Sequence, residues 1–119
     1  MKKTLIIGAT TNVERYAYKA AKMLTEEWHP IVPFGIKKGE VFGEEIINDW
    51  QDFKNIDTVT LYVGPARQNE YINKIISINP NRVIFNPGTE NKEFYNMLND
   101  AGIEYQEACT LVLLRTNQF

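Results

Sequence analysis

Histidine and cysteine, the side chains most used in nucleophilic catalysis and zinc binding, are scarce in this chain. Its 119 residues include one histidine, His29, and one cysteine, Cys109. A site with two histidine ligands or a zinc site with several cysteines is therefore impossible, and nothing supports a Cys–His dyad. His29 precedes a proline between a predicted helix and a predicted strand, so we interpret it as a residue of that boundary. The cations Arg15, Lys37 and Lys38 point instead to the binding of an anion.

The turn that begins at Gly8 is the strongest candidate for an anion site. The apolar residues 5–7 predict a strand, and apolar side chains at helical spacing predict a helix over residues 15–28. Gly8 allows the chain to turn sharply between these elements, and the small side chains of Ala9 and Thr10 keep the turn open. Such a turn leaves free backbone N–H groups at the start of the helix, where an anion can bind.

The same turn distinguishes among nucleotide ligands. Residues 8–13 contain only one of the three glycines of a dinucleotide-binding pattern, and they lack the lysine of a phosphate-binding loop. The strand expected at residues 29–34 is not followed by the acidic residue that would bind a free ribose. Lys37 and Lys38 follow instead, which favours a phosphorylated ribose. Arg15 could clamp a pyrophosphate, although a solvated lysine pair and a surface arginine remain the plain alternatives.

The elements that would position these residues alternate between strands and helices. We expect strands at residues 5–7, 29–34, 57–63, 82–85 and 103–107. We expect helices at residues 15–28, 67–78 and 91–100, the last closed by Gly102, with a loop at residues 35–45. Residues 46–56 predict a short helix or a turn, and residues 109–114 predict a final helical turn or an extra strand. The alternation predicts an α/β fold: a doubly wound, Rossmann-like, mostly parallel five-stranded sheet with helices on both faces.

Ligands of such sheets bind at the carboxyl ends of the strands, near the point where the strand order reverses. In this chain those ends are residues 8–13, 34–38, 63–67 and 86–91. The Gly8 turn and the lysine pair are thus predicted to meet at one edge of the sheet.

Composition narrows the classes of partner. A chain of 119 residues, 44% hydrophobic and 24% charged, is expected to form a single domain over residues 1–119. A net charge of −2 argues against nucleic acid as a partner. A single cysteine excludes an internal disulfide and fits a reducing compartment. No segment has the roughly 20 apolar residues that a membrane span needs, so we expect a cytoplasmic protein.

Taken together, the motifs resemble those of the stand-alone CoA-binding proteins. These are small Rossmann-type domains, also found as the nucleotide-binding part of succinyl-CoA synthetase α subunits. The matching positions, spread over essentially the whole chain, are Gly8-Ala9-Thr10, Asn12, Glu14-Arg15, Tyr18, Pro33, Gly43, Gly88-x-Glu90-Asn91, Ala101-Gly102-Ile103 and Cys109.

The resemblance implies coenzyme A or an acyl-CoA as the ligand. Gly8, Ala9 and Thr10 would line the pyrophosphate, with Arg15 assisting. Lys37 or Lys38 would bind the 3′-phosphate, while Val63, Gly64 and Pro65 would flank the adenine or ribose. Asn86, Gly88 and Glu90 would lie toward the pantetheine arm. Asn12, Tyr18 and Pro33 complete the set of residues that the resemblance assigns to the cofactor site.

We expect binding without catalysis. The synthetase relatives use a phosphohistidine on a separate domain, which this chain lacks. Glu90 more often caps a helix than acts as an acid or base, and Cys109, which could form a mixed disulfide with CoA, is more often a small core residue. Alternatives are an NAD(P)-dependent oxidoreductase or another nucleotide-using enzyme on the same fold, or a scaffold with a vestigial cleft. A homodimer or a protein partner is left open.

Overall fold

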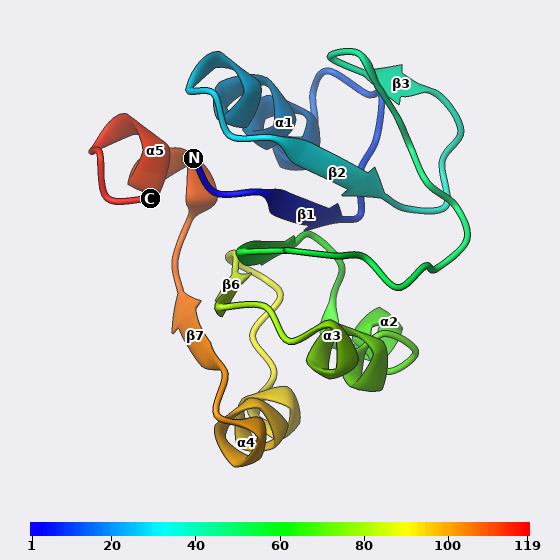
Figure 1. Ribbon diagram of the computed structural model, residues 1–119. Coiled ribbons are helices and arrows are strands. Elements are labelled where there is room, and N and C mark those ends of the chain that lie inside the picture. The colour runs from blue at the N-terminus through cyan, green and yellow to red at the C-terminus, as the bar shows by residue number, and fades with distance from the viewer.

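The computed structural model describes residues 1–119, in which strands and helices alternate (Figure 1). The strands are β1 (Thr4–Ile7), β2 (Ile31–Phe34), β3 (Glu40–Val41), β4 (Glu44–Glu45), β5 (Thr58–Leu61), β6 (Arg82–Phe85) and β7 (Glu104–Glu107). The helices are α1 (Tyr16–Glu26), α2 (Pro65–Gln68), α3 (Ile72–Ile78), α4 (Lys92–Ala101) and α5 (Thr110–Arg115).

Five of the strands form one parallel sheet in the order β2-β1-β5-β6-β7. The chain leaves β1 toward β2 and then crosses to β5 on the other side, so the strand order reverses between β1 and β5. A crevice for a ligand is expected outside the carboxyl ends of these two strands. The Rossmann-like sheet predicted from the sequence is confirmed.

Helices cover both faces of the sheet because β1 is apolar on both sides. Leu5 and Ile7 belong to the larger core cluster, which also includes side chains of α3 and α4. Ile6 points to the opposite face and belongs to a second cluster with α1 and α5. In Figure 1, α1 and α5 accordingly lie on one side of the sheet and α3 and α4 on the other.

Three predicted elements differ from the structure. Residues 46–56 form no helix; Ile47 makes a single parallel bridge to Phe34, and Phe53 reaches the core from an irregular segment. The loop predicted at residues 35–45 contains the β3–β4 hairpin, which turns through Phe42 and Gly43 at positive φ. The helix predicted at residues 67–78 is interrupted, giving α2 and α3.

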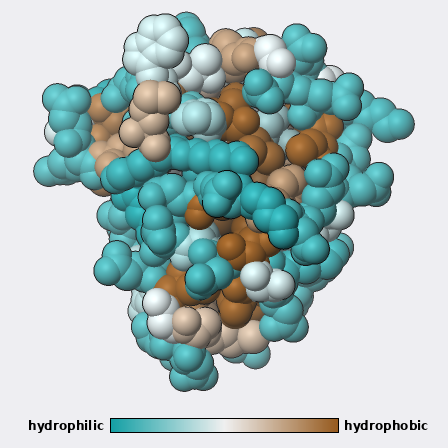
Figure 2. Space-filling view, viewed as in Figure 1, coloured by the Kyte–Doolittle hydropathy of each residue, from teal (hydrophilic) through white to brown (hydrophobic).

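The last segment, α5, is helical, which is one of the two forms predicted for it. Gly102 ends α4 in the left-handed conformation, with φ 72°, as predicted. None of the helices has the length and hydropathy needed to cross a membrane. The face shown in Figure 2 is mostly hydrophilic, with apolar side chains visible in the recesses between charged ones.

Candidate functional site

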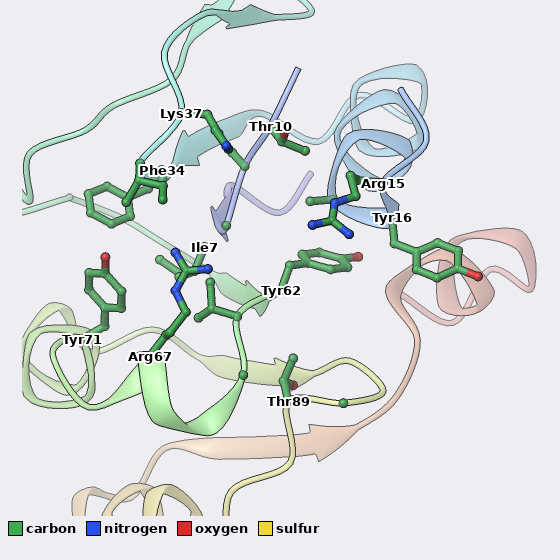
Figure 3. Close-up of a pocket in the computed structure, with 18 of the residues that line it drawn as sticks. Ile7, Thr10, Arg15, Tyr16, Phe34, Lys37, Tyr62, Arg67, Tyr71 and Thr89 are labelled. Carbon is green, nitrogen blue, oxygen red and sulfur yellow. The ribbon is translucent and has the colours of Figure 1, made fainter. Parts of the chain in front are cut away.

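A cavity of about 420 Å³ opens at the carboxyl edge of the sheet, where the strand order reverses. Its wall is formed by Ile7, Gly8, Ala9, Thr10, Glu14, Arg15, Tyr16, Ala17, Phe34, Gly35, Ile36, Lys37, Tyr62, Val63, Gly64, Arg67, Tyr71, Pro87, Gly88 and Thr89. These residues come from the last positions of β1 and β2 and from the segments after β1, β2, β5 and β6 (Figure 3). The volume lies within the range of about 300–1,000 Å³ that is usual for small-molecule sites.

The Gly8 turn packs tightly against the end of β2. The N–H groups of Gly8 and Ala9 both donate to the Phe34 carbonyl, at 2.9 and 3.0 Å. A Cβ at Gly35 would lie 2.9 Å from the Ala9 carbonyl oxygen, so only glycine fits there without displacement. The N–H groups of Gly8 and Ala9 are thus already used within the fold, although both residues line the cavity.

Free N–H groups lie instead at the start of α1. The preceding turn is closed internally, because the Asn12 N–H donates to Thr10 Oγ1 and the Glu14 N–H to Asn12 Oδ1. The helix has no capping side chain and no acidic residue in its first turn. The N–H groups of Tyr16 and Ala17 therefore have no partner within the chain. Both residues line the cavity, so an anion in it would meet the positive end of the helix.

Three cationic side chains line the cavity from three different segments: Arg15 before α1, Lys37 after β2 and Arg67 in α2. Figure 3 shows all three directed toward the same space. None of the three charged groups makes a hydrogen bond within the chain, and Glu14 is the one carboxylate residue in the wall. The site is therefore electropositive, with donors available for an anionic ligand.

Eight of the predicted site residues lie in the wall of this cavity: Gly8, Ala9, Thr10, Arg15, Lys37, Val63, Gly64 and Gly88. Seven do not: Asn12, Tyr18, Pro33, Lys38, Pro65, Asn86 and Glu90. The positions of these seven show what they do in the fold.

Three of the seven lie at or beyond the rim of the cavity. Asn12 shapes the turn before α1 through its carbonyl oxygens. The Tyr18 ring packs against Phe42, with centroids 5.1 Å apart, and faces a separate hollow beside α1. Lys38 is exposed just beyond Lys37 and reaches no part of the wall.

Three more of the seven, Pro33, Pro65 and Glu90, stabilise the fold and do not line the cavity. Pro33 lies within β2, and its carbonyl accepts a hydrogen bond from the Ile47 N–H at 2.9 Å. Pro65 occupies the first turn of α2, where the missing N–H costs nothing. The Glu90 carboxylate accepts the Gly88 N–H at 2.9 Å and so stabilises the turn before α4.

Asn86 is the centre of a buried hydrogen-bond network. It is 3% exposed, and its Nδ2 donates to Thr60 Oγ1 at 2.7 Å and to the Leu61 carbonyl at 2.8 Å. Its Oδ1 accepts the N–H of Thr110 at 2.9 Å, at the start of α5. Asn86 therefore fixes α5 to the sheet and is not available to a pantetheine arm.

Sequence reasoning missed several wall residues, chief among them Arg67, Tyr62 and Tyr71. Arg67 is the last residue of segment 63–67, one of the four carboxyl strand ends where a ligand was expected. The sequence pattern, however, indicated for Arg67 only a place in a helix. The neighbouring Gln68 is 1% exposed; its Nε2 donates to the carbonyls of Val63 at 2.9 Å and Thr89 at 2.7 Å. Gln68 thus ties together the two segments that carry Arg67 and Gly88.

Two tyrosines in the wall have raised pKa values. Burial raises the pKa of Tyr62 to about 12, and its hydroxyl makes no hydrogen bond. Burial, together with the nearby Glu70, raises the pKa of Tyr71, whose ring packs edge-on against Phe34 at 5.4 Å. Both hydroxyls are neutral at ordinary pH and offer no charge to a ligand.

Cys109 and His29 lie outside the cavity wall. Cys109 is half-buried and precedes α5. His29 Nδ1 accepts the Lys2 N–H at 2.9 Å, and burial lowers the pKa of His29. No three His, Cys, Asp or Glu side chains gather where they could hold a metal ion.

Comparison with known families bears directly on this cavity. The family model described as "CoA binding domain" matches residues 2–115, which is nearly the whole chain. The chain belongs to the CoA-binding domain family. The resemblance seen in the sequence is thereby confirmed, and the match includes every residue of the cavity wall.

Several solved structures share this fold. The crystal structure of an uncharacterized protein has a TM-score of 0.98 and 51% identity, covering 100% of this chain and 98% of that one. A hypothetical protein from Pyrococcus horikoshii has a TM-score of 0.84 and 27% identity, with 96% and 82% coverage. A Thermus thermophilus protein, at 22% identity, TM-score 0.87 and 99% and 90% coverage, shares the fold. No curated protein matches this member of the CoA-binding family.

Proposed function

We propose that this chain binds coenzyme A or an acyl-CoA in the cavity at the carboxyl edge of its sheet, and that it does so without catalysing a reaction. The observation that carries the proposal is the convergence of Arg15, Lys37 and Arg67 with the unpartnered N–H groups at the start of α1. Coenzyme A carries a pyrophosphate and a separate 3′-phosphate, so it matches a site with several spaced donors. Membership of the CoA-binding family supports the same ligand.

The donors divide between the two anionic groups of that ligand. Arg15, Thr10 and the start of α1 would bind the pyrophosphate, since an arginine and a helix N-terminus both favour a phosphate. Lys37 would bind the 3′-phosphate, and Val63 and Gly64 would flank the adenine or ribose. The pantetheine arm would then pass Gly88.

We propose that the chain has no catalytic role because the cavity wall lacks side chains suited to act as a nucleophile, an acid or a base. His29 and Cys109 both lie outside it. The one wall carboxylate, Glu14, is exposed and belongs to the turn before α1. The tyrosine hydroxyls have raised pKa values, which disfavours their use as bases at neutral pH. The chain would thus act as a carrier or a sensor of CoA, or as a partner of another protein.

Isothermal titration calorimetry with CoA, acetyl-CoA and NADPH tests the proposal. We expect CoA and acetyl-CoA to bind with one site per chain and dissociation constants below 1 mM, which corresponds to about −4 kcal/mol. NADPH is expected to bind more weakly, because the Gly8 turn has one glycine where a dinucleotide pattern has three. Tighter binding of NADPH than of CoA would favour an oxidoreductase instead.

A further inference from the structure

Arg67 is the one wall cation for which the sequence offered no role. It lies in the last turn of α2, its side chain is exposed, and its guanidinium makes no hydrogen bond within the chain. Figure 3 shows it reaching from α2 into the same space as Arg15, which comes from the segment before α1. Because the guanidinium makes no hydrogen bond within the chain, all of its donors are free for an anion in the cavity.

The backbone that carries Arg67 is held firmly. Pro65 fixes the first turn of α2, and the adjacent Gln68 is buried, with three hydrogen bonds of 2.7–2.9 Å to Val63, Thr89 and Asn91. Gln68 is buried whereas Arg67 lines the cavity, so the buried residue anchors the short helix from which Arg67 extends. The guanidinium therefore acts from a fixed base, as recognition of a phosphate by an arginine requires.

We propose that Arg67 and Arg15 form a two-sided clamp for a diphosphate, and that Arg67 makes the site select ligands with a diphosphate over ligands with isolated phosphates. Arg15 and the N–H groups of Tyr16 and Ala17 bind one phosphoryl group. Arg67 binds the other from the opposite side, with its planar fork of donors. The clamp rests on the proposed function, since it names the part of coenzyme A that Arg67 contacts.

Calorimetry on Arg67→Gln tests the clamp with three ligands. CoA and dephospho-CoA both contain the diphosphate, whereas adenosine 3′,5′-bisphosphate contains only isolated phosphates. Arg67→Gln should weaken CoA and dephospho-CoA alike, by about tenfold or more, and the bisphosphate much less. Arg67→Lys should fall between, because it keeps the charge and loses the fork. Arg115→Gln is the matched control, an exposed arginine outside the cavity wall that should change nothing.

Two results would overturn the clamp. The first is an Arg67→Gln variant that binds all three ligands as the wild type does. The second is a loss greater for CoA than for dephospho-CoA, which would place Arg67 at the 3′-phosphate. If the wild type binds no CoA, the proposed function fails and titration with inorganic pyrophosphate decides the clamp separately. Pyrophosphate binding that Arg67→Gln abolishes would then support the clamp, and no pyrophosphate binding by the wild type would reject it.

Discussion

Two lysines, Lys37 and Lys38, stand next to each other in the segment after β2. Lys37 lies in the cavity wall, and the segment that carries it is held by Asn48 Nδ2, which donates to the Gly35 and Lys37 carbonyls at 2.7 and 2.8 Å. Lys38 lies outside the wall. The structure therefore separates two residues between which the sequence could not choose, and it makes Lys38 a natural control for Lys37.

Substitution of Lys37 should discriminate between CoA and dephospho-CoA. In Lys37→Gln we expect the affinity for CoA to fall about tenfold, because a charge-assisted contact to the 3′-phosphate is lost. The affinity for dephospho-CoA, which lacks that phosphate, should hardly change, and Lys38→Gln should leave both ligands unaffected. The test is the dissociation constant of each variant, Lys37→Gln and Lys38→Gln, for CoA and for dephospho-CoA, measured by calorimetry against the wild type. An equal loss for both ligands would show that Lys37 contacts another part of CoA.

Tyr62 is expected to make the free energy of unfolding fall as the pH rises through the alkaline range. Its pKa is about 12 in the folded chain against 10.0 for a free tyrosine, and burial is the main cause. A raised folded-state pKa favours the folded state fully below pH 10, and this contribution is lost as the pH rises toward 12. The pKa difference between the folded and the unfolded chain corresponds to roughly 2–3 kcal/mol of unfolding free energy. About half of this contribution should be lost by pH 11.

The variant Tyr62→Phe isolates this contribution. Between pH 9 and pH 11 the wild type should lose about 1 kcal/mol more of its unfolding free energy than the variant does. At pH 8 the two proteins should differ little in stability, because the buried hydroxyl lies beside Thr60 and Thr110 without forming a hydrogen bond of good geometry. Urea denaturation at the three pH values measures both effects. Parallel pH dependence in the two proteins would contradict the assigned pKa.

At the scale of elements, Gln68 joins the segments after β5 and β6. Replacing it with leucine would leave the Val63 and Thr89 carbonyls without donors, at a cost of about 2–3 kcal/mol in unfolding free energy. CoA affinity should fall as well, because α2 would lose the anchor beside Arg67. Asn69→Ala, at the exposed neighbouring position, should change stability by less than about 0.5 kcal/mol. Urea denaturation and calorimetry on both variants provide the test, and an unchanged Gln68→Leu stability would refute the anchoring role.

The elements that the sequence predicted well are those whose side chains form continuous or periodic apolar patterns. β1 and β6 contain apolar runs that are buried on both faces, and α4 has an apolar stripe that ends at Gly102. The cap of α4 is Asn91, whereas Glu90, expected to cap a helix, accepts the Gly88 N–H. The short helix or turn predicted at residues 46–56 is instead an irregular segment, whose apolar side chains are buried one by one. Spacing along the chain does not distinguish these two cases.

The site was only partly predictable because a position after a strand does not decide what a side chain contacts. The Gly8 turn and Lys37 follow strands, at whose carboxyl ends ligands bind, and both line the cavity. Asn86 also follows a strand, but its side chain is fully hydrogen-bonded within the core, to Thr60 and Thr110 among others, which are distant in sequence. Whether a polar side chain faces a ligand or the core depends on tertiary contacts, and a single sequence does not record them.

At the scale of the whole molecule, the parallel sheet brings four chain segments to one edge. The order β2-β1-β5-β6-β7 places the turn after β1 between the segments after β2 and β5, and cations from all three segments surround one cavity. A separate hollow beside α1 is lined by Tyr18, Lys22 and Arg115 among others. The location of ligand binding therefore discriminates between two surfaces of the molecule.

Titration of the ¹⁵N-labelled chain with CoA, followed through the amide resonances, tests the central claim most directly. We predict saturable shifts at CoA concentrations below 1 mM, concentrated at Thr10, Tyr16, Ala17, Lys37 and Gly64, which surround the cavity. Amides at the α1 hollow, such as those of Lys22 and Arg115, should remain nearly unchanged. No shifts up to millimolar CoA, or shifts confined to the α1 hollow, would contradict the account.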